Sequence, residues 1–406
     1  MNSTKTMPTK MKSTKGLCFA LPVALLTLEA LGQTWQTVDN LQYVAGSAYN
    51  QARAAAVDAH GNVYFSGEGY DVTGVMHAVV MGSSDHGDTW IPLEDFTAST
   101  NRQNQFNALG FDAAQNLYAI ALSGAMGRPS NPHLIVRKSP DLGATWSTAL
   151  DFALAGYNSQ AGSPGFAADS AGRIFVATWG DPLGSIVLRS GDAIATWSTL
   201  HPFADKALVD GILNTPSGLF VCGSADSLFG AVLPYVMWGT VRKSVDGGAT
   251  WTSVDTYNPP GFTGSGLVQA ICADASGNIY VGGWANITTG KGRNAVTKPY
   301  CVIRKGTNGG SKWQTVATLP IPGTEIGNLA LGFDSAGGLY AGGALGIPDY
   351  GLLKSLDAGV TWNVVDSFPF NPMCFACDNA GAVYFGGFAT STAGLGAGEH
   401  WIVRKQ

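Results

Sequence analysis

The sequence predicts an all-β fold, a seven-bladed β-propeller of four-stranded blades whose ring is closed by the N-terminal strand in the last blade. Three observations predict it. A turn motif of the pattern S-x-D-x-G-x-T-W returns with a period near fifty residues, which is typical of propellers and repeat arrays. A second turn motif returns between the copies of the first. The two ends of the chain are also complementary, because each supplies a strand that the other lacks.

The first motif is complete at 244–251, where the sequence reads S-V-D-G-G-A-T-W. Its Ser and Asp side chains can hydrogen-bond nearby backbone groups, its glycine adopts a conformation that other residues avoid, and Thr-Trp begins a strand. Further copies lie at 83–90, 139–146, 190–197, 306–313 and 355–362, and a seventh is reduced to Thr34 and Trp35. Ile194 replaces the glycine of the third copy, and the fifth copy has lost its Ser, Asp and Thr. We expect looser hairpins at these two copies.

The second motif is a turn with Asp and Gly at the bend, followed by a strand that carries an aromatic residue. It occupies 58–64, 112–118, 169–175, 214–220, 274–280, 334–340 and 378–384. Short runs of small residues precede it, as at 54–57 and 108–111, and small side chains suit the crowded innermost strand of a blade.

A third repeat, apolar and then basic, precedes the S-x-D motif, as at 133–138, 239–243 and 301–305. Each blade therefore reads as a small-residue strand, an Asp-Gly turn, an aromatic strand, a long loop, an apolar-basic strand, an S-x-D turn and a Thr-Trp strand. The chain ends at 400–406 with a third strand and no fourth, whereas residues 34–39 supply a fourth strand with no third. Pairing these ends closes the ring and removes an open sheet edge.

The S-x-D-x-G-x-T-W pattern resembles the Asp-box, also called the BNR repeat, of sialidases, xyloglucanase-type glycosidases, sortilin-like receptors and a photosystem II assembly factor. The resemblance covers essentially the whole chain after residue 32 and implies a propeller. Sialidases bind a substrate carboxylate with three arginines, the first within an F/Y-R-I-P motif at the start of an inner strand. Arg53 occupies a similar place, but it lies between Ala52 and Ala54, so that motif is absent.

Residues 1–32 read as a signal peptide and 33–406 as one propeller domain. Lys5, Lys10, Lys12 and Lys15 precede an apolar stretch at 17–28, and small residues follow at 30–32. A membrane anchor is the weaker alternative, because a spanning helix needs about 20 apolar residues. We therefore expect cleavage near Gly32, a location outside the cytoplasm (extracellular or periplasmic), no membrane insertion and a monomer.

Composition argues against several classes of function. Without residues 1–32, which hold four Lys and one Glu, the chain's 23 basic and 28 acidic residues fall to 19 and 27, a net charge of −8. No basic stripe for nucleic acid is present. The histidines show no metal-ligand spacing, and no phosphate-binding loop or nucleophile elbow occurs, so we expect neither a metal nor a cofactor.

The order of strands predicts two different faces of the ring. The Asp-Gly and S-x-D turns lie on one face; the long loops between second and third strands and between blades form the other, called here the irregular face, where we expect function to lie. Nine carboxylates outside the repeats fall in these loops: Glu68, Asp71, Asp181, Asp205, Asp210, Asp226, Glu325, Asp349 and Glu399. A glycosidase needs two carboxylates facing one cleft. Among the nine, the candidate catalytic residues are Asp71, Asp181, Asp226, Glu325 and Asp349.

The candidate binding residues are cations and aromatic side chains of the irregular face that the repeats do not explain. They are Arg53, Arg102, Tyr49, Tyr157, Trp179 and Trp284. Such aromatic residues stack on sugars or contact proteins, but they also pack over blade ends. The leading hypothesis is a secreted, non-catalytic propeller that binds a protein or glycan through the irregular face. The alternative is a glycan-active hydrolase or lyase resembling sialidase-like or xyloglucanase-like enzymes.

Overall fold

We obtained a computed structural model of the 406-residue chain. It describes residues 26–27, 34–43, 49–98, 103–124, 132–154, 164–180, 184–191, 196–203, 207–226, 237–257, 262–290, 292–321, 328–343, 345, 350–367, 369–390 and 398–406.

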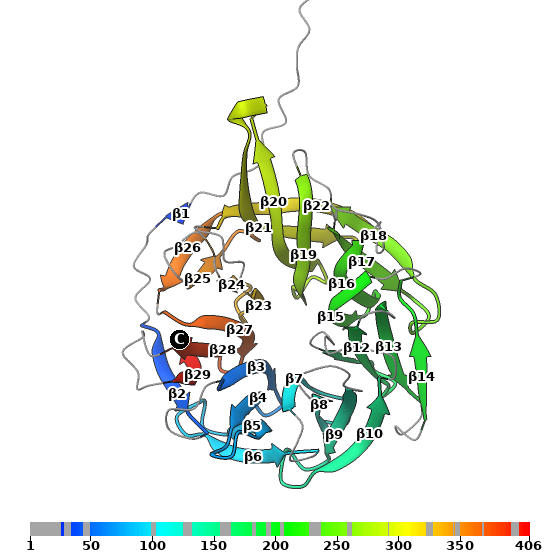
Figure 1. Cartoon of the computed structure of the whole chain (residues 1–406), viewed down its shortest axis with the longest axis vertical. Coiled ribbons are helices and arrows are strands. Elements are labelled where there is room, and N and C mark those ends of the chain that lie inside the picture. The colour runs from blue at the N-terminus through cyan, green and yellow to red at the C-terminus, as the bar shows by residue number, and fades with distance from the viewer. Residues whose placement is uncertain are drawn as a thin grey trace, which may run out of the picture.

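Seven four-stranded antiparallel blades surround a central axis (Figure 1). The first is β3 (Gln51–Val57), β4 (Val63–Tyr70), β5 (Met76–Ser83) and β6 (Ile91–Phe96). The second is β7 (Gln103–Phe111), β8 (Leu117–Gly124), β9 (His133–Ser139) and β10 (Ser147–Ala153). The third is β11 (Gly165–Ala168), β12 (Ile174–Gly180), β13 (Gly184–Ser190) and β14 (Trp197–Leu200). The fourth is β15 (Ala207–Thr215), β16 (Gly218–Asp226), β17 (Met237–Ser244) and β18 (Thr252–Tyr257).

The fifth blade is β19 (Phe262–Ala273), β20 (Ile279–Thr289), β21 (Val296–Thr307) and β22 (Lys312–Pro320), with the 3-10 helix η2 (Gly292–Asn294) between β20 and β21. The sixth is β23 (Ala330–Phe333), β24 (Leu339–Gly343), β25 (Gly351–Ser355) and β26 (Trp362–Asp366), with β1 (Leu26–Thr27) parallel to β26. The seventh is β27 (Asn371–Cys377), β28 (Val383–Thr390), β29 (Glu399–Lys405) and β2 (Gln36–Leu41). The hairpin of β20 and β21 extends beyond the ring (Figure 1).

The predicted fold and its closure are confirmed. Strand β2 pairs antiparallel with β29, from Gln36 opposite Lys405 to Leu41 opposite Trp401. The strand begins two residues later than the expected 34–39, because Trp35 precedes the ladder and is buried against Tyr340 and Phe385.

Six of the seven turns of the second motif are held by the carboxylate of their own aspartate, whereas the turn at 214–220 has Asn214 in its place. Asp58 accepts hydrogen bonds from the backbone nitrogens of His60 and Asn62, at 2.8 and 2.9 Å, and from the hydroxyl of Tyr64 at 3.1 Å. The backbone part of this arrangement recurs at Asp112, Asp169, Asp274, Asp334 and Asp378. These aspartates therefore stabilise turns, as the repeat predicts.

The S-x-D-x-G-x-T-W hairpins are also closed by their own side chains. In 244–251, Ser244 Oγ accepts from the Gly248 nitrogen at 2.7 Å and donates to Asp246 at 2.7 Å, and Asp246 accepts from the Thr250 nitrogen at 2.9 Å. The same network recurs at 83–90, 139–146 and 355–362. The sequence pattern did not reveal a second left-handed residue before the glycine, such as Leu142 with φ 58°.

The two altered copies were expected to be looser. Residues 192–195 of the third copy, which include Ile194, lie outside the described residues. In the fifth copy the backbone nitrogen of Gly310 donates to the carbonyl of Thr307 at 3.1 Å, and Trp313 Nε1 donates to the carbonyl of Gly310 at 2.8 Å. That turn thus keeps backbone and indole hydrogen bonds after losing the Ser and Asp side chains.

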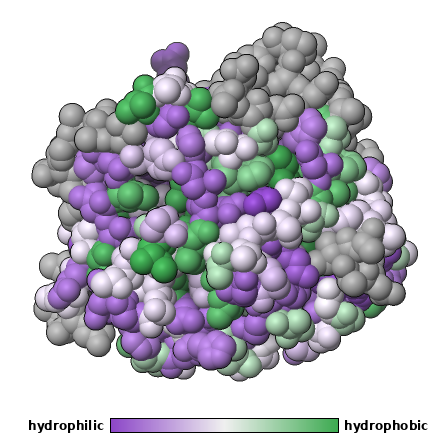
Figure 2. Space-filling view, turned by 90° about the horizontal axis from the view of Figure 1, so that it is seen from below, coloured by the Kyte–Doolittle hydropathy of each residue, from purple (hydrophilic) through white to green (hydrophobic). Residues whose placement is uncertain are grey.

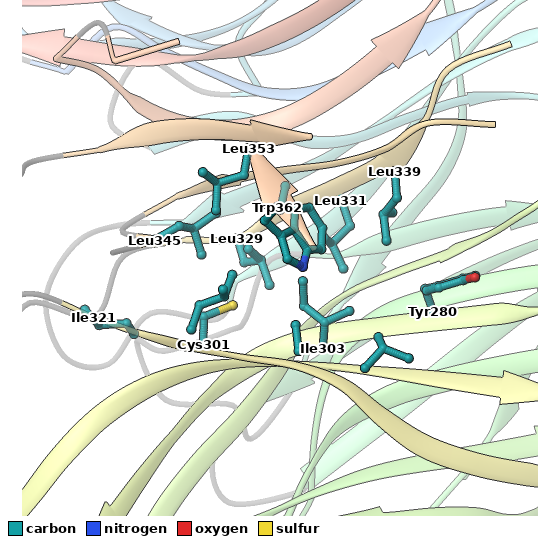
Figure 3. Packing of buried hydrophobic residues seen from close by; sticks show 14 residues of the cluster. Tyr280, Cys301, Ile303, Ile321, Leu329, Leu331, Leu339, Leu345, Leu353 and Trp362 are labelled. Atoms are coloured by element: carbon teal, nitrogen blue, oxygen red, sulfur yellow. The ribbon is translucent and has the colours of Figure 1, made fainter. Parts of the chain in front are cut away.

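The core lies between neighbouring blades. Figure 3 shows Trp362 of β26 packed between side chains of the fifth and sixth blades, with Ile303 on one side and Leu331 on the other. Ion pairs join other neighbouring blades: Arg137 with Glu94, Arg304 with Asp255, and Arg404 with Asp366. Each runs from a third strand to the fourth strand of the preceding blade, so the basic ends of the third strands bind blades together.

The outer surface is mixed in character. Seen from the side of β6, hydrophilic residues predominate and hydrophobic ones are scattered (Figure 2). Across the part of the chain that the structure describes, we find no helix with the length and apolarity needed to cross a membrane.

Candidate functional site

A one-residue bulge near the irregular face distinguishes five of the seven innermost strands. At each bulge, one extra residue of the inner strand has no partner residue in the second strand. The extra residues are Arg53, Asn107, Asp210, Gln269 and Met373. Bulges re-aim side chains and are frequent next to active sites. Four of these five residues are polar, although they lie in apolar, small-residue strands.

Arg53 of β3 is paired with Glu68 of β4. Its Nε lies 2.6 Å from Glu68 Oε2 and 2.8 Å from Oε1. The Glu68 side chain is 0% exposed and that of Arg53 19% exposed, so the guanidinium covers the carboxylate. Burial raises the pKa of the Glu68 carboxyl, and the Arg53 guanidinium offsets part of that increase.

A second carboxylate joins this pair from the seventh blade. Glu399 begins β29, and its Oε1 accepts a hydrogen bond from Gln51 Nε2 at 2.8 Å. Gln51 lies directly opposite Glu68 in the β3–β4 ladder, which brings the two carboxylates into one cluster. Burial raises the pKa of Glu399, and the charge of Glu68 raises it further, whereas the Gln51 amide lowers it. Unlike Glu68, Glu399 is partly exposed.

Asp210 forms a separate acidic position in the fourth blade. Trp179 Nε1 of β12 donates to its Oδ1 at 3.3 Å, and its Oδ2 is buried without a hydrogen-bond partner in the structure. Burial raises the pKa of Asp210 to about 7. A carboxyl with a pKa near neutrality is suited to proton transfer, and perturbed acids of this kind cluster at functional sites.

A third polar cluster lies at the irregular-face end of the first blade. His77 Nδ1 lies 2.6 Å from Asp95, and Tyr43 donates its hydroxyl proton to Asp95 Oδ2 at 2.5 Å. His77 Nε2 is 3.4 Å from Asp71. However, His133 and Asp151 pair in the same way in the second blade, with the same separation of 18 residues. The His–Asp pair therefore recurs in the first two blades, and Tyr43 and Asp71 join it in the first.

The catalytic candidates have different outcomes. Asp71 lies in the β4–β5 turn, where its Oδ1 accepts from the nitrogens of Thr73 and Val75. Hydrogen bonds from the Thr73 hydroxyl and the Val75 backbone lower its pKa to about 2, which suits a carboxylate that stabilises a turn better than a proton donor. Asp226 ends β16 opposite Met237, and its side chain is outside the described part. Asp181, Glu325 and Asp349 also lie outside the described residues.

Two of the binding candidates come together and two do not. Arg53 pairs with Glu68, and Tyr49 directly precedes Asn50 and Gln51, whose side chains bind Glu399. Trp179 contacts Asp210 instead. Trp284 of β20 packs against the core of the fifth and sixth blades and lines a small cavity of about 20 Å³ with Tyr257 and Arg304, as a packing residue would. Arg102 and Tyr157 lie outside the described residues.

Sequence reasoning placed Glu68, Asp210 and Glu399 on the irregular face but did not single them out. One sequence signal could have identified Glu68. If the two strands beside the Asp58–Gly61 turn are paired outward from that turn, with one bulged residue in the first strand, Gln51 lies opposite Glu68. Nothing comparable connects Glu399 to these residues, because its approach depends on ring closure. Among the residues that the structure describes, no three His, Cys, Asp or Glu side chains are arranged to hold a metal ion.

Comparison with known proteins finds a distant sequence relative and solved structures of similar fold. No family model matches the chain. A xyloglucanase of Paenibacillus sp. is 27% identical over 310 residues, which are 70% of this chain and 29% of the relative, so the chain spans under a third of that protein.

Two solved structures share the fold. A protein of unknown function from Dyadobacter fermentans has a TM-score of 0.50 at 12% identity, covering 91% of this chain and 98% of that chain. An α-L-arabinofuranosidase from Fusarium graminearum, in complex with an iminosugar inhibitor, has a TM-score of 0.51 at 9% identity over 91% of this chain and 98% of that chain. At such identities the likeness is one of fold.

Proposed function

We propose that the protein is a glycan-active propeller of the hydrolase type, which binds a polysaccharide on its irregular face. The observation that carries this proposal is the cluster of Glu68 and Glu399 around Arg53 and Gln51. Neither carboxylate belongs to a repeat, so neither is explained by the blades. A glycan-active hydrolase was the alternative hypothesis from the sequence. The distant likeness to a xyloglucanase favours this hypothesis over a non-catalytic role.

Hydrolysis of a glycosidic bond needs an acid that is protonated when the substrate binds. Glu399 fits this role because burial raises its pKa while the side chain remains partly exposed. Glu68 does not contact a substrate directly, since its side chain is 0% exposed under Arg53. We assign it a positioning role, in which it orients Arg53 and adds to the negative field at Glu399.

Asp210 is a second candidate for proton transfer, because its pKa of about 7 suits a general acid. It lies in the fourth blade and Glu399 in the seventh, so we treat them as separate candidates. A glycosidase uses two carboxylates, and the variants below test each one alone.

The substrate that we propose is a β-glucan of the xyloglucan type. The relative's name supplies this choice, and the 70% of this chain that aligns with it includes most blades. Because the chain spans only 29% of that relative, the activity and the substrate both belong to the proposal.

The experiment measures release of reducing ends from xyloglucan by purified protein, compared with Glu399→Gln and Asp210→Asn. Loss of a general acid lowers turnover by about 10²–10⁴-fold, and we expect this for at least one variant. Asp88→Asn is the matched control, because Asp88 is 77% exposed on the opposite face. Binding of xyloglucan without product release would instead support the non-catalytic binding role, and full activity in both variants would exclude these two acids.

A further inference from the structure

We infer that Tyr49 and Tyr70 form a sugar-stacking platform beside Glu399, which binds an uncharged β-linked glucan chain. The inference rests on the proposed function, because both place a glycan on the irregular face. It adds the residues that hold the chain and the class of glycan, and it does not require that the glycan be cleaved.

The platform consists of two aromatic rings at the irregular-face end of the first blade. Tyr49 is 50% exposed and is the one aromatic side chain among the large exposed hydrophobic residues of the described part. Its ring centroid lies 5.9 Å from that of Tyr70 at an angle of 58°. The Tyr70 hydroxyl accepts a hydrogen bond from Gln103 Nε2 at 2.9 Å, which fixes the second ring. The pair presents an angled aromatic surface.

The backbone of Tyr49 is held in a conformation that non-glycine residues avoid. Its φ is 62°, in the left-handed region, which is uncommon for a bulky side chain. Strain of this kind persists only where surrounding structure imposes it, and it is concentrated at functional sites. If no aromatic ring were needed at this position, we would expect glycine or asparagine here.

The residues that follow Tyr49 also hold Glu399. The buried Asn50 side chain accepts from the Tyr43 nitrogen at 2.9 Å and donates to the Glu399 carbonyl at 2.8 Å. Close packing requires Gly69, because a Cβ there would lie 2.9 Å from Asn50 Oδ1 and 2.6 Å from Tyr43 Cβ. Residues 49–51 thus present Tyr49 outward while Asn50 and Gln51 both bind Glu399.

Charge and ring chemistry together select the ligand class. Arg53, the cation of this cluster, is already paired with Glu68, so it does not offer a free charge to a sugar carboxylate or sulfate. The whole chain has a formal net charge of −5, which disfavours polyanions. A β-linked glucose ring carries its hydroxyls equatorially and therefore exposes apolar faces that stack on aromatic rings. An uncharged β-glucan satisfies both conditions.

The test is binding, measured by affinity electrophoresis and calorimetry with xyloglucan, with polygalacturonate as the anionic comparison. We expect wild type to bind xyloglucan and not polygalacturonate. Tyr49→Gly should bind about tenfold more weakly, whereas Tyr49→Phe, which keeps the ring, should bind as wild type does. Glycine tolerates a φ of 62°, so Tyr49→Gly keeps the backbone conformation, and urea denaturation of the variant checks that a loss of binding does not come from unfolding.

Val245→Gly is the control, since Val245 is 79% exposed on the opposite face and should not affect binding. If wild type binds xyloglucan and Tyr49→Gly binds equally well, the platform is wrong and the proposed function stands. If Tyr49→Gly loses binding but wild type releases no product, the platform stands and the hydrolase proposal fails. Preference for polygalacturonate, or no binding of either glycan by wild type, would overturn the inference.

Discussion

The guanidinium of Arg404 in β29 donates a hydrogen bond from Nη2 to the backbone carbonyl of Trp35, over 3.2 Å. Its Nη1 donates to the Thr37 hydroxyl at 3.0 Å, and its Nε to Asp366 in the sixth blade at 2.8 Å. One buried side chain therefore joins the N-terminal strand, the C-terminal strand and the preceding blade. The ring is closed by contacts between residues that are 369 positions apart in the sequence.

Deletion of residues 33–40 should open the seventh blade. The deletion removes Trp35, which is buried at 8% exposure, and most of β2. Loss of a buried tryptophan alone costs about 3–5 kcal/mol, so we expect the free energy of unfolding to fall by at least that amount. Denaturation in urea measures it. An unchanged midpoint and slope would show that β2 does not hold the ring closed.

Replacement of Arg53 by alanine should destabilise the fold. The change leaves the Glu68 carboxylate buried without its partner, and breaking a buried ion pair in this way costs about 3–5 kcal/mol. The double variant Arg53→Met with Glu68→Leu removes both charges and should recover most of that loss. A double-mutant cycle by urea denaturation checks this. Wild-type stability in Arg53→Ala would mean that Arg53 is free to serve as a ligand-binding cation.

The architecture could be predicted from sequence because its determinants are local. Asp58 holds its turn through residues two and four positions later, and Ser244 and Asp246 do the same for their hairpin. Because these contacts join residues close in sequence, they produce a fixed spacing of residue types that is visible in the sequence. The closure was also predictable, since a missing fourth strand at one end matches an additional one at the other.

The candidate site could not be predicted in the same way. Gln51 and Glu399 are hydrogen-bonded across 348 residues, and no local pattern encodes that contact. The bulges that present Arg53 and Asp210 depend on pairing between two strands, not on the composition of either one. In addition, Asp71 was chosen over Glu68 as a candidate from the sequence, yet Asp71 stabilises a turn whereas Glu68 pairs with Arg53.

Ser244→Ala should destabilise its hairpin without affecting glycan binding. Ser244 is buried, and its Oγ accepts a hydrogen bond from the Gly248 nitrogen at 2.7 Å. Alanine leaves that nitrogen without its partner, at a cost of about 1–3 kcal/mol. Thermal unfolding should show a lower Tm, while xyloglucan binding by the folded variant stays at the wild-type level. Binding lost at full stability would mean that the S-x-D face takes part in function.

Asp210→Asn should stabilise the protein in a way that depends on pH. Burial raises the pKa of Asp210 to about 7 in the folded state, whereas an unfolded chain has the ordinary value of about 3.9. The folded state therefore holds this proton more tightly, and the stability of wild type falls as the pH rises from about 4 to about 7 and then levels off.

Asparagine carries no charge at any pH and avoids this loss. We expect the two proteins to have similar stability at pH 4, and the variant to be more stable by on the order of 2–4 kcal/mol at pH 8. Urea denaturation at both pH values measures the difference, with Asp88→Asn, a change at an exposed carboxylate, as the control. A difference between wild type and Asp210→Asn that does not change with pH would show that Asp210 titrates normally, and it would remove this residue from the candidate proton donors.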